Sequence, residues 1–87
     1  MHEASLIRNL MRKIDALAKA ERADRVTTVR IWLGALSHMS ADHFREHFEH
    51  ASRGTIANGA SLEIDVSTDV GDPNAQELLL RSIEVET

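Results

Sequence analysis

Residues 25–33 read RVTTVRIWL, and this stretch decides the fold class of the chain. Val, Thr and Ile are β-branched, and their restricted side chains pack well on an extended strand. Successive side chains of a strand alternate between its two faces. The face predicted to point into the core therefore carries Thr27, Val29, Ile31 and Leu33, and the opposite face carries Val26, Thr28, Arg30 and Trp32.

Four further elements surround this strand, each with its own apolar pattern. They are predicted as a helix over 4–20, a helix over 41–52 capped by Ser40, a strand over 61–66 and a strand over 78–86. The apolar side of the first helix is made by Leu6, Ile7, Leu10, Met11, Ile14, Leu17 and Ala18, and that of the second by Phe44, Phe48 and Ala51. In the strand over 61–66, the side chains predicted to point inward are Leu62, Ile64 and Val66, with Glu63 and Asp65 outward.

The order of the elements, α-β-α-β-β, predicts an α+β fold for a single domain over residues 1–87. We expect two layers, with two helices packed on one face of a three-stranded mixed sheet. The first two strands and the helix between them would form a crossover unit if the strands are parallel. The last strand alternates cleanly only from Arg81 onward, so a bulge or register change is expected near Leu79 and Leu80.

Composition excludes several classes of function. The net charge is −4 and the basic residues are scattered, which argues against nucleic acid and anionic membrane surfaces as partners. No apolar run reaches the roughly 18 residues of a membrane span. The chain has no cysteine, so disulfides, thiolate zinc sites and cysteine nucleophiles are excluded. This usage agrees with a cytoplasmic location.

The first candidate site is the opening tripeptide, Met1, His2 and Glu3. A deprotonated α-amine, the imidazole of His2 and the backbone amides of His2 and Glu3 offer four closely spaced nitrogen donors. Such a set suits the square-planar preference of Ni(II) or Cu(II). The alternative is a frayed terminus, in which Glu3 only favours the positive end of the first helix.

The second candidate site is a group of histidines, His43, His47 and His50, on the second predicted helix. Spacings of three and four residues can place all three on one helix face, where two imidazoles one turn apart can chelate a divalent ion. The alternative is a solvated face with His47 half buried. The pattern is not HExxH, and neither a nucleophile elbow nor a glycine-rich phosphate loop occurs, so no enzymatic activity is predicted.

A candidate protein-binding residue is Trp32, which is predicted on the sheet face opposite the helices. An exposed tryptophan there would make an anchor for a partner, although a loop or the chain end could equally cover it. The exposed edge of a small sheet can also pair between two copies, which leaves a homodimer open.

Taken in order, five segments resemble the HypA/HybF family of nickel metallochaperones, which act in NiFe-hydrogenase maturation and in some cases serve urease. The segments are MHE (1–3), RVTTVRIWLGALS (25–37), HFREHFEHASRGT (43–55), ASLEIDV (60–66) and LLLRSIEVE (78–86). The resemblance covers nearly the whole chain. It implies that Met1, His2 and Glu3 hold Ni(II), and that the partners are a hydrogenase large subunit and the maturation GTPase.

The chain departs from the family pattern in one large respect. Family members carry a zinc-binding module of two CxxC-type pairs before the last strand, whereas this chain has the loop 67–77 and no cysteine. No structural zinc is therefore expected. The main hypothesis is a nickel metallochaperone without enzymatic activity. The alternative is a regulatory subunit that carries no metal and docks on a maturation protein through the Trp32 face.

Overall fold

The structure is a computed structural model that describes residues 2–87, with His2 described by its backbone alone. Its elements are α1 (His2–Ala20), β1 (Arg25–Leu33), α2 (Ala41–Ser52), β2 (Ser61–Val66) and β3 (Leu78–Glu86). The predicted order and the predicted bounds of the three strands and of α2 are confirmed. Helix α1 begins two residues earlier than predicted, which places Glu3 in its first turn.

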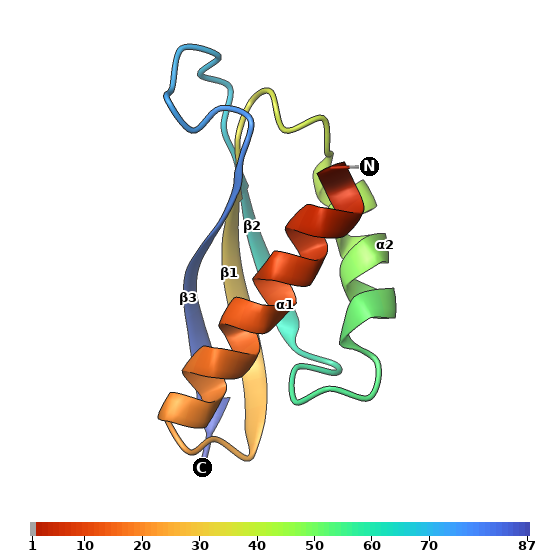
Figure 1. The fold of residues 1–87 in the computed structure, drawn as a ribbon, viewed down its shortest axis with the longest axis vertical. Coiled ribbons are helices and arrows are strands. Elements are labelled where there is room, and N and C mark those ends of the chain that lie inside the picture. The colour runs from red at the N-terminus through yellow and green to blue at the C-terminus, as the bar shows by residue number, and fades with distance from the viewer. Residues whose placement is uncertain (1) are drawn as a thin grey trace.

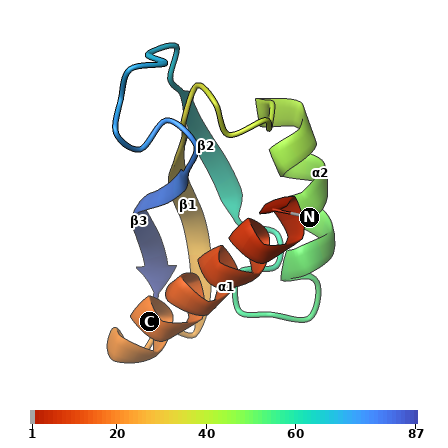
Figure 2. The same cartoon turned by 45° about the horizontal axis from the view of Figure 1, so that its top comes forward.

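The strands form one mixed sheet in the order β2-β1-β3. β1 is parallel to β2 and antiparallel to β3, so α2 lies in the crossover between two parallel strands. Figures 1 and 2 show α1 and α2 side by side on the same face of this sheet. The predicted two-layer α+β architecture is therefore confirmed. Neither helix of residues 2–87 is long and apolar enough to cross a membrane.

Two irregularities of the β1–β3 ladder change which side chains face the helices. Val26 pairs with Val85 and Thr28 with Glu84, so Thr27 is an extra residue on β1. Such a bulge interrupts the alternation of faces. Val26 is consequently buried in the core, whereas Thr27 is only half-buried and donates its hydroxyl to the Glu84 carbonyl. The prediction that Thr27 points inward and Val26 outward is wrong for this reason.

The second irregularity confirms the expected register change in the last strand. Arg30 pairs with Ser82 and Ile31 with Leu80, which leaves Arg81 as the extra residue of β3. The change lies one residue beyond the predicted position. It lets Leu80 and Ile83 both pack against the core, because the bulge absorbs the odd spacing between them.

The core lies between the sheet and the two helices. Its most deeply buried large side chains are Leu10, Ile14, Val26, Val29, Ile31, Leu33 and Phe44. The prediction of an inward side chain is wrong for two residues, because Leu17 is 45% exposed and Val66 is 48% exposed. Leu17 belongs to the last turn of α1, and Val66 ends the edge strand β2, so neither is enclosed by neighbouring elements on all sides.

The opposite face of the sheet carries charge at its centre. Arg30 donates from Nε to Glu63 Oε1 at 2.9 Å and from Nη2 to Glu84, so one guanidinium joins all three strands. The hydrogen bond that Arg30 donates to Glu84 first, and the one it donates to Glu63 second, raise the pKa of Arg30 above its ordinary value. The outward positions predicted for Glu63 and Asp65 are confirmed, because both are exposed.

Trp32 lies on this central strand but is buried, with only 8% of its surface exposed. Its neighbours in the sheet are Asp65 on one side and Leu79 on the other, so strands flank it on both sides. Of the two alternatives left open for Trp32, exposure and cover, the structure shows cover. Docking of a partner through Trp32 stays a prediction, but the side chain is not the exposed anchor that such docking would use.

The loop 67–77 is held by its own hydrogen bonds and by the end of β1. Asp69 Oδ1 accepts from the Gly71 amide at 2.9 Å, and Asp72 Oδ1 accepts from the Asn74 amide at 2.7 Å. The Gly34 amide donates to the Glu77 carbonyl at 2.9 Å, and the Leu36 amide to the Ala75 carbonyl at 2.7 Å. These bonds tie the loop to the segment that follows Leu33.

Candidate metal centre

Glu3 stands in the first turn of α1, close to the start of the chain. Two further predicted nickel ligands, Met1 and the side chain of His2, lie outside the described residues. The side chain of Glu3 is 30% exposed, so much of it is covered by neighbouring groups. A carboxylate in this turn also interacts favourably with the positive end of the helix dipole.

Helix α2 supplies the histidines, and its orientation is determined by its buried face. Ser40 caps the helix, and its Oγ accepts from the His43 amide at 3.1 Å, as predicted. Phe44 and Phe48 are buried in the core, one turn apart. Each residue of an α-helix is rotated about 100° from the one before. His43 and His47 therefore form a second pair beside the phenylalanines, on the side of α2 that faces α1.

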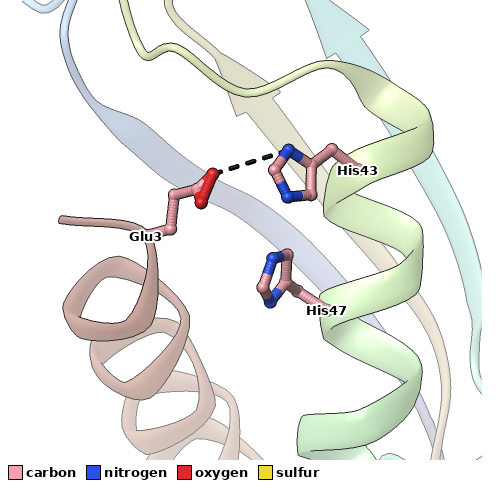
Figure 3. A group of neighbouring side chains, drawn as sticks. All are labelled: Glu3, His43 and His47. Atoms are coloured by element: carbon pink, nitrogen blue, oxygen red, sulfur yellow. Dashed lines mark ion pairs between the residues drawn. The ribbon is translucent and has the colours of Figure 1, made fainter. Parts of the chain in front are cut away.

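The two helices bring Glu3, His43 and His47 together (Figure 3). Glu3 Oε2 lies 3.5 Å from His43 Nδ1, which makes an ion pair whenever His43 is protonated. The rings of His43 and His47 have centroids 4.7 Å apart and planes inclined at 37°. One ligand atom from each of the three side chains can be chosen so that all lie within 4.8 Å of one another.

One residue of the first candidate site thus lies beside the second candidate site. Glu3 of the opening tripeptide reaches the imidazoles of His43 and His47, across 40 residues of sequence. His50 is exposed and does not belong to the group, so the structure joins only two of the three predicted helix histidines. Apolar patterning predicts that both helices cover the same face of one small sheet, but it does not give their positions relative to each other, so it did not predict this meeting.

Chemically, the group offers two imidazole nitrogens and one carboxylate oxygen. Neutral imidazole and carboxylate together suit borderline first-row ions such as Ni(II) and Zn(II). All three side chains come from the helix layer, and none comes from the sheet. Among the side chains that the structure describes, this is the one group of three or more histidines and carboxylates close enough to share an ion.

Comparison with known families gives a match over most of the chain. The family of hydrogenase/urease nickel-incorporation metallochaperones, HypA, matches residues 1–72. The match includes the opening tripeptide, both helices and the first two strands. It ends within the loop 67–77, where the sequence departs from the family pattern.

Individual relatives agree with the family match. The hydrogenase maturation factor HypA of Methylocella silvestris is 39% identical over 66 residues, which are 76% of this chain and 58% of that protein. The hydrogenase maturation factor HypA of Archaeoglobus fulgidus is 39% identical over 66 residues, 76% of this chain and 60% of that protein. The chain thus spans about six tenths of the length of these relatives.

Solved structures show the same fold. The solution structure of the Ni metallochaperone HypA from Helicobacter pylori matches with a TM-score of 0.77 at 18% identity, covering 97% of this chain and 97% of that one. A second solution structure of a HypA protein matches with a TM-score of 0.73 at 23% identity, covering 98% of this chain and 96% of that one.

Proposed function

Because this chain belongs to the HypA family of hydrogenase and urease nickel-incorporation metallochaperones, we propose that it is a nickel carrier without enzymatic activity. It binds Ni(II) and delivers it during the maturation of NiFe-hydrogenase, with urease as a second recipient. The partners are a hydrogenase large subunit and the maturation GTPase. The observation that carries the proposal is the family match from residue 1, which includes Met1, His2 and Glu3.

The proposed nickel ligands are the Met1 amine, the imidazole and amide of His2, and the amide of Glu3, with the Glu3 carboxylate nearby. Helix α1 begins at His2, and the first four amides of a helix have no acceptor within it. The amides of His2 and Glu3 are among these, so metal binding need not break a helical hydrogen bond. Four nitrogens in one plane match the geometry that Ni(II) prefers.

A site at the end of a chain suits the transfer of a metal. The terminal amine can leave first and the other ligands can follow one at a time, so a recipient can replace each donor in turn. The bound form requires a neutral amine and two deprotonated amides, and metal binding therefore releases protons. Nickel affinity should consequently fall as the pH is lowered, and acid should favour release.

Nickel titration of the protein with its native first residue tests this site. Ni(II) should produce the visible absorption band of a square-planar nitrogen complex. The band should be lost on His2→Ala and on extension of the chain before Met1. His50→Ala is the matched control, because it also removes one histidine but from an exposed position elsewhere. An unchanged band in either the His2 variant or the extended protein would refute the proposed ligand set.

The absence of cysteine leads to a second expectation about metals. Since no thiolate is available, the proposal includes no structural zinc of the kind held by CxxC pairs. Within the loop 67–77, the carboxylates of Asp69 and Asp72 accept hydrogen bonds from the Gly71 and Asn74 amides and so close its turns. The protein prepared free of metal should therefore still unfold in one cooperative thermal transition, because the loop 67–77 needs no zinc to fold.

A further inference from the structure

We propose that Glu3, His43 and His47 form a second metal site, one that takes a borderline divalent ion such as Zn(II) or Ni(II). It differs from the proposed nickel site because its donors are three side chains from two helices, and it needs neither the terminal amine nor any backbone amide. It does not rest on the nickel-carrier function, although the two sites have Glu3 in common.

The distances between donors are close to those of a bound ion. Metal–nitrogen and metal–oxygen bonds of about 2.0–2.2 Å place tetrahedral ligands roughly 3.3–3.5 Å apart. Glu3 Oε2 and His43 Nδ1 are already 3.5 Å apart, and all three donor atoms lie within 4.8 Å of one another. Small side-chain rotations suffice to close the remaining gap, because the side chain of His43 is 43% exposed and has room to turn.

The backbone that carries the donors is held in place on both sides. Phe44 and Phe48 anchor α2 in the core beside the two histidines, and Ile7 anchors α1 one turn beyond Glu3. The Ser40 cap stabilises the turn of α2 that carries His43. Much of the ordering that binding requires is thus already present in the folded chain, and this favours affinity.

The donor set also predicts which ions should bind. Two imidazoles and a carboxylate are a three-ligand set like that of open zinc sites, in which a water or an incoming group takes the fourth position. Mg(II) and Ca(II) prefer oxygen ligands and should bind poorly. An open position next to the proposed nickel site would let a metal or a recipient's ligand approach from the α2 side.

A protein extended by Gly-Ser before Met1 isolates this site, because the extension moves the terminal amine away and leaves all three side chains in place. Zn(II) is titrated against a chromophoric chelator of known affinity. One equivalent should bind, and millimolar Mg(II) should not displace it. Failure of the extended protein to bind Zn(II), or displacement by Mg(II), would overturn the proposal.

Single substitutions in the extended protein identify the ligands. Changes around a metal site that leave its ligands intact already cost about 10–100-fold in affinity. His43→Ala and His47→Ala should therefore each weaken Zn(II) binding at least about tenfold, and Glu3→Gln should weaken it too. His50→Ala is the control and should bind as the parent does. Equal weakening by His50→Ala, or parental affinity in the His43 and His47 variants, would contradict the assignment.

A direct readout accompanies the affinities. In NMR spectra of the imidazole nitrogens, Zn(II) should shift His43 and His47 together at one equivalent and leave His50 in place. Far-UV circular dichroism of each variant shows whether the helices remain folded. The square-planar nickel band is measured only on the protein with its native first residue, and Zn(II) binding is measured only on the extended protein. Failure of one proposal is thereby distinguished from failure of the other.

Discussion

Replacing Gly34 with alanine should destabilise the protein strongly, because the loop 67–77 passes directly over this residue. A Cβ at position 34 would lie 2.2 Å from the Ala75 carbonyl oxygen and 2.7 Å from the Asn74 carbonyl oxygen. Real Cβ contacts essentially never fall below 3.0 Å. The obstacle is backbone rather than a flexible side chain, so the loop itself must move by about 0.8 Å or more.

The size of the effect follows from what that movement disturbs. Overpacking a filled site costs about 1–3 kcal/mol. The shift also strains the hydrogen bonds of Leu36 to Ala75 and of Gly34 to Glu77, each of which contributes about 1 kcal/mol. Alanine has fewer backbone conformations than glycine in the unfolded chain, and this offsets about 0.4–1 kcal/mol of the loss in stability. The net loss should be about 2–4.5 kcal/mol, or about 8–36 °C in the unfolding midpoint of a domain this small.

Thermal unfolding followed by far-UV circular dichroism measures this loss, with Gly71→Ala as the control. Gly71 lies in the same loop, and a Cβ there would meet only Asp69 Oδ1 at 3.4 Å, an ordinary contact. The free energy of unfolding of the Gly71→Ala protein should stay within about 0.5 kcal/mol of the parent value. Hydrogen exchange should also speed up at the Leu36 amide in the Gly34 variant alone. Equal midpoints for the two variants would refute the close approach of the loop to Gly34.

Three further predictions test the cap, the core and the buried tryptophan. Ser40→Ala should lower the free energy of unfolding by about 1 kcal/mol in chemical denaturation, and an unchanged value would contradict the cap. Phe44→Ala should cost about 3–5 kcal/mol by the same method, against about 1 kcal/mol for the half-exposed Leu17→Ala; similar losses would contradict the core. The fluorescence of Trp32, the only tryptophan, should resist iodide quenching until the protein unfolds, and strong quenching of the native protein would refute its burial.

The elements of this fold follow from local patterns. The bounds of β1, α2, β2 and β3 could be predicted because apolar spacing, the Ser40 cap and β-branched residues act within a few residues of one another. The register change of β3 was visible in the same way, as a break in its alternation near Arg81. The bulge at Thr27 was missed. Strict alternation places Val26 on the same face as Thr28 and Arg30, and only pairing with β3 shows that Thr27 is an extra residue.

The candidate site was predictable in its members and not in its assembly. Residue type and spacing identified potential metal ligands in two separate places, Glu3 in the opening tripeptide and His43 and His47 in the second helix. Their meeting depends on how far along each other the helices lie and which way each faces the core. These quantities are decided by Ile7, Phe44 and Phe48 packing on one sheet, an interaction between distant parts of the chain.

By itself, the sequence determined the five elements, the exclusion of thiolate chemistry and the resemblance that begins at Met1, because these depend on composition and on short-range order. Only the tertiary structure decided that Trp32 is buried and that Glu3 stands beside His43 and His47. The physical reason is the same in both cases. Burial and proximity arise from contacts between segments far apart in the chain, and residue spacing within one element carries no information about them.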